Sequence, residues 1–388
     1  MIKRYLRYHP EVVRDTKSAE NKNGLNPMRF LIMSLTGFVD IEIKPNFYDA
    51  CARKVFPKHA IQSTFLPDPR KMKIFRYLKK LWIGDKVAEL LSTTWWAIHN
   101  RKNFDVILGW HGSGDLLAIA GALFRWRKPR ICLIYYRLYN PNSPKWLIFL
   151  KRFLLKFASK GCALLLSVDQ EQAALFEREL GRAPGTTSSF RYGIDYEWFE
   201  HYLKNFGNFP KQNTIFCPGS AYRDDTTLFN AISEMEVEAK RFKLRLESKR
   251  VASNSRRIGK ANIVNMYNRP YAEYVPACLE STAVVISVNN NDVPAGLTAL
   301  LECMALGRPI IITRGLSTNN YSIDGVTALE YDKGDSVQLR RQISKFLENP
   351  ELAENIAMTA RETLKREYNL DRCGTALAKL LWQSTKIE

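Results

Sequence analysis

Short apolar runs alternate with longer amphipathic segments along most of the chain, and their lengths predict the secondary structure. Helical spacing of apolar residues predicts helices over 115–124 and 170–180. In the first half, runs short enough to be buried strands occupy residues 29–34, 104–108, 131–135, 163–167 and 190–192. Strand, helix and strand in succession form the βαβ unit of a parallel sheet that is covered on both faces. The first half therefore predicts an α/β domain.

The same alternation resumes after an aromatic-rich break. In the second half we expect helices at 271–279 and 298–306, and strands at 213–217, 263–266, 283–288 and 310–313. Two such halves joined once predict an α/β fold with two Rossmann-like domains facing across a cleft, the usual ligand site of such proteins. The expected parts are an N-terminal extension (1–27), a first domain (28–195), a linker (196–212), a second domain (213–366) and a C-terminal helix crossing back to the first domain (367–388).

The net charge of the chain indicates what kind of partner it binds. The chain has 388 residues, a length that suits two domains, and its 58 Lys and Arg against 39 Asp and Glu leave a net charge of +19. Such an excess indicates a polyanionic neighbour, either a phospholipid surface, a phosphorylated acceptor or a nucleic acid. The charge alone does not choose among the three.

Cysteine and histidine usage predicts a cytoplasmic protein without a protein-built metal site. The seven cysteines are scattered and form no CxxC pair, and the five histidines lack the spacing of metal ligands. The opening residues 1–27 lack the apolar core of a signal peptide, and no run of about 20 apolar residues favours a membrane span.

Candidate chemistry concentrates in residues 284–321. A helix there places Leu297 on its apolar face and opens at Gly296, so the amides of Gly296, Leu297 and Thr298 are expected to bind phosphate at the positive end of the helix dipole. Glu302 lies about one turn into this helix, where a carboxylate accepts hydrogen bonds from ribose hydroxyls. Gly37, in the loop after the first strand, is expected to allow close approach of a ligand.

Gly296-Leu297 followed by Glu302-Cys-Met-Ala-Leu-Gly307-Arg-Pro309 resembles the donor-binding region of the retaining glycosyltransferases of the GT-B fold, family 4. The resemblance implies transfer of a sugar from a UDP- or GDP-linked donor, with retention and with no cofactor or metal. The family's first acid is replaced by Pro294, with Asp292 nearby as its candidate substitute.

Two weaker matches extend this resemblance across both domains, so that it covers roughly residues 100–380. Tyr192-Gly193-Ile194-Asp195 is similar to the family's interdomain crossing, and the loop of Gly219, Ser220 and Arg223 resembles the one whose cations hold the diphosphate. In that loop Arg223 is the expected clamp, since a guanidinium binds phosphate bidentately. The resemblance also implies that His111 lies near the donor sugar. Met266 begins the segment expected to contact the base.

Each of these assignments has a plainer alternative. Glu302 could be a solvated acid, Arg223 could pair with Asp224 or Asp225, and His111 could bond a neighbouring carbonyl. Asp292 is more often a capping residue than a catalyst. No Asp-x-Asp motif occurs, which argues against a metal-bound diphosphate site.

Residues 70–82 have the composition of a helix that lies on an anionic bilayer. The patch that we assign to the membrane or acceptor consists of Lys71, Lys73, Phe75, Arg76, Lys79, Lys80 and Trp82. The alternative is a surface helix that packs its apolar side on its own domain. Residues 145–160 are more apolar and predict a core helix with basic ends.

Three functions remain open on the sequence alone. The first is a glycosyltransferase acting on a glycan or lipid-linked acceptor, peripheral on the inner face of a membrane. The second is a glycosyltransferase that modifies nucleic acid. The third is a catalytically inactive GT-B-like binding protein, which the missing first acid permits.

Overall fold

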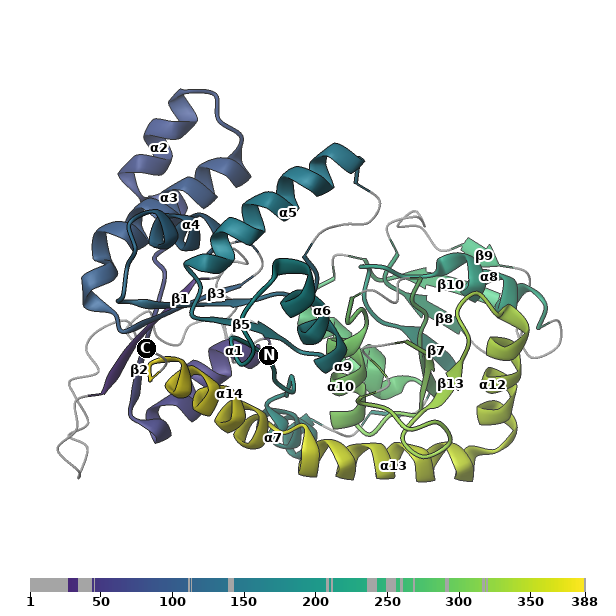
Figure 1. The fold of residues 1–388 in the computed structure, drawn as a ribbon. Coiled ribbons are helices and arrows are strands. Elements are labelled where there is room, and N and C mark those ends of the chain that lie inside the picture. Colours follow the sequence, from purple (N-terminus) through teal and green to yellow (C-terminus); the bar gives the residue numbers. More distant parts are fainter. Residues whose placement is uncertain are drawn as a thin grey trace.

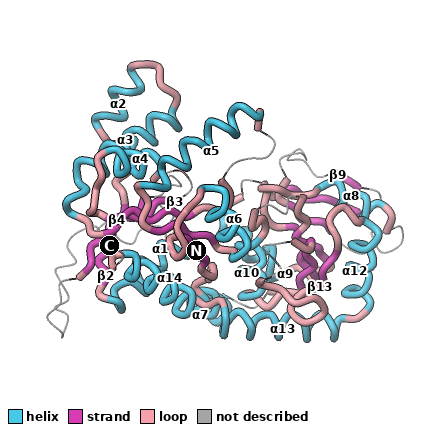
Figure 2. The backbone as a smooth tube through the Cα atoms, in the orientation of Figure 1, coloured by secondary structure: helices cyan, strands magenta, loops and turns pink. Residues whose placement is uncertain are grey.

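The computed structural model contains two α/β domains, one around each of two twisted sheets (Figure 1). It describes residues 27–33, 44, 46–110, 112, 114–138, 143–206, 209–210, 212–235, 243–248, 256–258, 261–267, 269–289, 293–315, 318 and 320–386. In both domains helices cover the strands, as the cyan and magenta tubes of Figure 2 show.

The sheet of the first domain has six parallel strands in the order β2-β1-β3-β4-β5-β6. Its strands are β1 (Met28–Met33), β2 (Ile61–Phe65), β3 (Val106–Trp110), β4 (Arg130–Ile134), β5 (Leu164–Ser167) and β6 (Thr187–Ser189). The strand order reverses between β1 and β3, so ligands are expected beyond the carboxyl ends of these two strands.

Helices cover both faces of this sheet. One face packs against α3 (Asp85–Asn100), α4 (Asp115–Leu123), α5 (Lys145–Lys160) and α6 (Gln170–Leu180), while α2 (Lys73–Lys80) packs on α3. The other face meets α1 (Phe47–Ala50) and the helical turns 51–59.

The second sheet has the order β13-β12-β11-β7-β8-β10-β9, and β9 alone is antiparallel to its neighbour. Its strands are β7 (Thr214–Cys217), β8 (Lys243–Leu246), β9 (Arg256–Ile258), β10 (Ala261–Asn265), β11 (Ala283–Ile286), β12 (Ile310–Thr313) and β13 (Leu329–Tyr331). The helices of this domain are α8 (Asp225–Ser233), α9 (Tyr271–Glu280), α10 (Leu297–Ala305), α12 (Ser336–Glu348) and α13 (Pro350–Glu367). Omitting β9, this is the Rossmann order, with its switch point between β7 and β11.

Three segments differ from what the sequence pattern predicts. The strand expected at 190–192 lies instead at β6, three residues earlier, because apolar Phe190 and Tyr192 belong to the core below the sheet edge. The segment 196–212 contains a helix, α7 (Tyr196–Phe206), and the polar stretch 236–260 contains β8 and β9.

The predicted core helix at 145–160 is a surface helix. Only Leu155 and Ala158 of α5 are buried, while Trp146, Phe149 and Phe153 are exposed. The expectation was wrong because the number of apolar residues in a helix does not say whether the domain supplies a layer to cover them.

The chain returns to the first domain at its end. α13 runs along the bottom of the molecule in Figure 1, and α14 (Leu370–Ser384) continues beneath the first domain, near which the C-terminus lies. Leu377 and Leu381 of α14 are fully buried in a cluster that contains residues of both domains. At the crossing, the Tyr192 amide donates to the hydroxyl of Tyr321, 2.8 Å away. The two domains therefore share one continuous apolar cluster beside the cleft.

Candidate functional site

A cavity of about 580 Å³ opens between the two domains at the switch point of the second sheet. Its walls include the loop after β7, the entrance of α10, the start of α9 and two segments of the first domain. The lining residues are Lys44, Tyr136, Arg137, Gly219, Ser220, Ala221, Tyr222, Arg223, Glu247, Arg269, Tyr271, Tyr274, Val293, Pro294, Ala295, Gly296, Leu297, Thr298, Ala299 and Glu302.

The loop after β7 holds Arg223 against the cavity. Its Nε donates to the carbonyl oxygen of Pro218 at 2.7 Å, and its Nη1 donates to that of Ala221 at 3.2 Å. Gly219 has a φ of +81°, and a Cβ there would lie 2.2 Å from the Arg223 Nη2. The positive φ therefore favours glycine at this position, and a larger residue would also push the guanidinium aside.

The neighbouring acids are occupied elsewhere. Asp224 caps α8 by accepting from the Thr227 amide at 3.1 Å, and Asp225 accepts from the Ser248 hydroxyl at 2.5 Å. Within the described part of the chain, neither acid forms a salt bridge with Arg223. Burial lowers the pKa of Arg223, which nevertheless stays charged at neutral pH. The arginine is thus available to an anionic ligand.

The amino end of α10 forms the facing wall. Gly296 caps the helix in the left-handed conformation, with φ +85° and ψ −8°, and no side chain caps this end. The first amides of a helix have no intrahelical acceptor, so those of Thr298 and Ala299 can donate to an anion in the cavity. The Arg223 Nη1 lies 3.6 Å from where a Cβ of Gly296 would be. A cation and a helix amino end therefore converge on one point.

Glu302 lies deeper in the same cavity and is only 4% exposed. Its Oε1 accepts from the Tyr271 hydroxyl at 3.1 Å. Burial raises the pKa of Glu302, while the positive charge of Lys44 and the hydroxyls of Tyr274 and Tyr271 lower it. A buried carboxylate that keeps acceptor capacity is suited to hydroxyl groups of a ligand.

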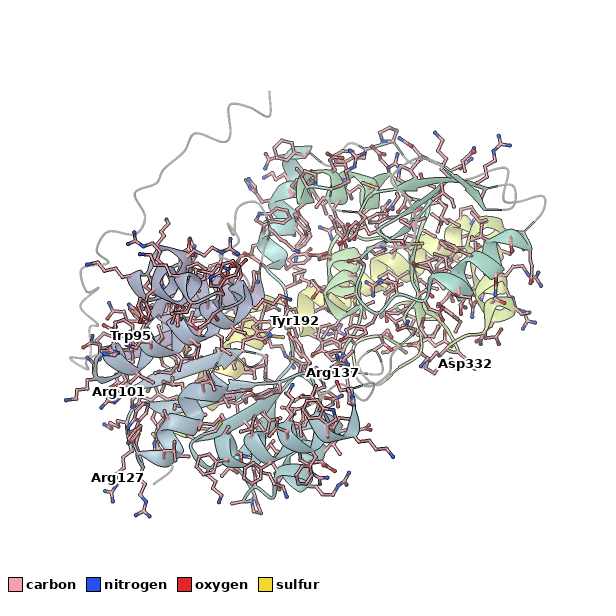
Figure 3. All side chains as sticks on the ribbon, turned by 90° about the horizontal axis from the view of Figure 1, so that it is seen from above. Trp95, Arg101, Arg127, Arg137, Tyr192 and Asp332 are labelled. Carbon is pink, nitrogen blue, oxygen red and sulfur yellow. The ribbon has the colours of Figure 1, made fainter. Side chains whose placement is uncertain are left out.

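The first domain contributes cations from across the cleft. Arg137, labelled between the two domains in Figure 3, donates from Nη2 to the Tyr222 hydroxyl at 2.6 Å. Its guanidinium also lies 5.2 Å from the centre of the Tyr222 ring. The Lys44 ammonium lies 5.6 Å from the centre of the Tyr271 ring. The cavity is therefore lined by four cations, from Lys44, Arg137, Arg223 and Arg269.

Seven of the nine expected donor-binding residues line this cavity: Gly219, Ser220, Arg223, Gly296, Leu297, Thr298 and Glu302. Met266 does not line it, because its side chain packs into the shared apolar cluster. Gly37, the last of the nine, lies outside the described residues. The two expected catalytic residues, His111 and Asp292, also lie outside them.

Several charged or hydrogen-bonding residues of the cavity were missed on the sequence, among them Glu247, Arg137, Tyr271 and Lys44. Glu247, which accepts from the Gly219 amide, follows β8, a strand hidden within a polar stretch. Arg137 follows β4 by three residues, and a charged residue just after a predicted buried strand is the signal that could have found it. Tyr271 starts a predicted helix, and Lys44 had no such signal.

The charged side chains of the proposed membrane or acceptor patch around α2 are exposed to solvent. Its lysines and arginines are all exposed, and Trp82 is 97% exposed at the end of α2. Phe75 is half-buried, as are Ile74 and Leu78, so the apolar side of α2 packs on its own domain.

The described residues show neither a metal-binding cluster nor a membrane-spanning helix. They contain no group of three or more His, Cys, Asp or Glu side chains placed to hold a metal ion. None of the helices in the described ranges has the length and apolarity needed to cross a membrane.

The second domain matches a known family. Residues 246–363 match the family described as "Glycosyl transferases group 1". A search of curated proteins finds no significant match.

The whole chain resembles several solved structures in fold. HepE from Anabaena in complex with UDP-glucose has a TM-score of 0.63 at 14% identity, over 92% of this chain and 100% of that chain. A glycosyltransferase from Rickettsia africae ESF-5 has a TM-score of 0.62 at 13% identity, over 94% and 100%. WaaG, a glycosyltransferase involved in lipopolysaccharide biosynthesis, has a TM-score of 0.60 at 14% identity, over 91% and 99%. Residues 246–363 are thus similar to the glycosyl transferases group 1, and the chain as a whole has the two-domain GT-B fold.

Proposed function

We propose that the protein transfers a sugar from a nucleotide-diphosphate sugar to an acceptor hydroxyl. The observation that carries this proposal is the shared cavity in which Arg223, the amino end of α10 and Glu302 meet. The sequence match over residues 246–363 and the fold support the same reaction class. A UDP-linked donor is the first choice, since similar structures of HepE contain UDP and UDP-glucose.

Different residues of the cavity bind different parts of the donor. Arg223 and the free amides of α10 bind the diphosphate, whose negative charge grows as the sugar leaves. Glu302 accepts hydrogen bonds from ribose hydroxyls, with Tyr271 holding its carboxylate in place. Stabilising the leaving group and placing the acceptor hydroxyl by the sugar carbon are the two requirements of the transfer. His111 and Asp292 are proposed near the reacting sugar.

The finer points of the proposal rest on the family resemblance and on charge. We propose retention of the anomeric configuration, family 4 membership and transfer without a metal or other cofactor. The acceptor is a glycan or a lipid-linked molecule, and the net charge of +19 suits a cytoplasmic protein that is peripheral on an anionic membrane.

The donor site is tested by calorimetric titration with UDP and by hydrolysis of UDP-glucose. Arg223→Gln should weaken UDP binding about tenfold to hundredfold, the effect of losing one hydrogen bond between charged groups. Glu302→Gln should weaken UDP binding by a similar factor, because it removes acceptor capacity for the ribose.

Arg341→Gln is the matched control, since Arg341 is exposed on α12 and does not line the cavity. It should leave the UDP affinity unchanged. The proposal fails if the wild-type protein binds none of UDP, GDP and ADP. It also fails if both cavity variants bind UDP as tightly as the wild type does.

A further inference from the structure

The amino-terminal part of α5 presents its apolar side chains to solvent. Trp146 is 68% exposed, Phe149 is 74% exposed and Phe153 is 62% exposed. A monomeric surface rarely carries three neighbouring aromatic side chains without a partner for them. These residues therefore indicate a surface that is covered in the working state.

The exposed aromatics form one stripe on the helix, opposite its buried side. Trp146, Phe149 and Phe153 stand at positions i, i+3 and i+7, which share a helix face. Leu155, which is buried, follows Trp146 by nine residues, or two and a half turns, and so points the other way. The stripe thus faces away from the sheet, and nothing in the described domain packs over it.

A row of positive charge accompanies this stripe. Residues 145–160 contain five Lys or Arg and no Asp or Glu. Arg152 is paired with Glu179 at 2.9 Å, whereas Lys145, Lys156 and Lys160 are exposed. Aromatic and aliphatic side chains flanked by lysines are the composition of a helix lying in the interface of an anionic bilayer.

The loop between α2 and α3 lies on the same side of the first domain as the amino end of α5 (Figure 1). In Figure 1 the loop between α2 and α3 and the amino end of α5 both form the top of the first domain. The loop between α2 and α3 begins with Leu81 and Trp82, which are also exposed.

We propose that α5 is the principal membrane-binding helix of this protein, with Trp146, Phe149 and Phe153 inserted among anionic lipids and the Trp82 loop as a second contact. A membrane at this face would present a lipid-linked acceptor to the domain whose Lys44 and Arg137 line the cavity. The bilayer contact stands on the surface itself, and only the role of the acceptor rests on the proposed function.

Vesicle flotation tests the bilayer contact. The full chain should float with vesicles of phosphatidylglycerol and phosphatidylcholine and stay behind with phosphatidylcholine alone. The triple variant Trp146→Gln, Phe149→Gln and Phe153→Gln keeps helix-forming residues and should reduce binding at least about tenfold. The matched control, Val337→Gln with Met358→Gln, changes exposed apolar residues of the second domain and should float like the wild type.

A label reports insertion directly. All seven native cysteines are buried, so Phe149→Cys can be labelled selectively with an environment-sensitive dye, and Met358→Cys serves as its control. We expect anionic vesicles to shift the emission of the dye at position 149 to shorter wavelength and to leave the emission of the dye at position 358 unchanged.

The inference is overturned if the triple variant floats like the wild type. It is also overturned if the aromatics prove to bury against a second copy of the chain, seen as a dimer that the triple variant abolishes. UDP affinity is measured on the same variants. A triple variant that binds UDP like the wild type but no longer floats supports the bilayer contact. A wild-type protein that floats but binds none of UDP, GDP and ADP refutes the proposed function alone.

Discussion

Asp115 shows how one buried carboxyl sets a pH dependence. It is the first residue of α4, and the Tyr135 hydroxyl donates to its carboxylate. Burial raises its pKa from 3.8 to about 6, with Lys151 opposing the shift. The folded protein therefore holds this proton more tightly than the unfolded chain does, so the free energy of unfolding falls as the pH rises from about 4 to 6 and stays low above that range.

Asp115→Asn should remove this dependence. The variant should match the wild type near pH 4 and exceed its free energy of unfolding by up to about 3 kcal/mol at pH 7.5, the value of a shift of about two pKa units. Urea unfolding at a series of pH values measures the difference.

Asp85→Asn is the control of opposite sign, because a hydrogen bond from Lys79 lowers the pKa of Asp85. The Asp85 carboxylate stabilises the fold at pH values above the pKa that this group has in the unfolded chain. This contribution is lost as the pH falls through its lower pKa in the folded protein. A difference between Asp115→Asn and the wild type that stayed constant with pH would contradict the assignment.

At the scale of elements, the turn into α10 sets the position of the helix amides in the proposed donor site. Gly296 has a φ of +85°, and a Cβ there would lie 2.7 Å from Ile286 Cγ2 on β11. Gly296→Ala should cost about 1–3 kcal/mol of stability and should also displace the amides that we propose bind the diphosphate. Thermal melts with and without UDP separate the two effects, with a reduced UDP-dependent shift expected.

Gly334→Ala is the matched control for this substitution. Gly334 has a φ of +81° in the same domain, with nothing within 4 Å of where its Cβ would lie. It should lose stability but keep the whole UDP-dependent shift. Equal losses of the UDP shift in both variants would mean that strain alone, not the position of α10, is responsible.

On the scale of the whole molecule, α14 fastens the two domains together. Leu377 is fully buried in the cluster shared by both domains, so Leu377→Ala should destabilise the protein by about 2–5 kcal/mol. Loosened packing should also speed proteolysis near Tyr368, between α13 and α14. Leu339→Ala, equally buried but within the second domain alone, should destabilise without this local cleavage. Equal cleavage in both would refute the fastening role.

Sequence reasoning recovered much of the sheet and one wall of the site. Helix α6 begins and ends at the predicted residues, because Asp169 caps it and Gly181 ends it in the left-handed conformation. Glycines of the donor loops were found because positive φ leaves few other choices. Strand β8 was missed since its residues, Lys243–Leu246, include two basic side chains.

The sequence by itself determined the two βαβ halves and, with the family resemblance, the Arg223 loop and the α10 entrance of the second-domain wall, since local spacing dictates strands, caps and turns. Only the tertiary structure decided that Lys44 and Arg137 face Arg223 across the cleft, and that the aromatic stripe of α5 stays uncovered. The physical reason is the same in both cases. Which surfaces meet depends on how distant elements pack, and periodicity along one element carries no information about its neighbours.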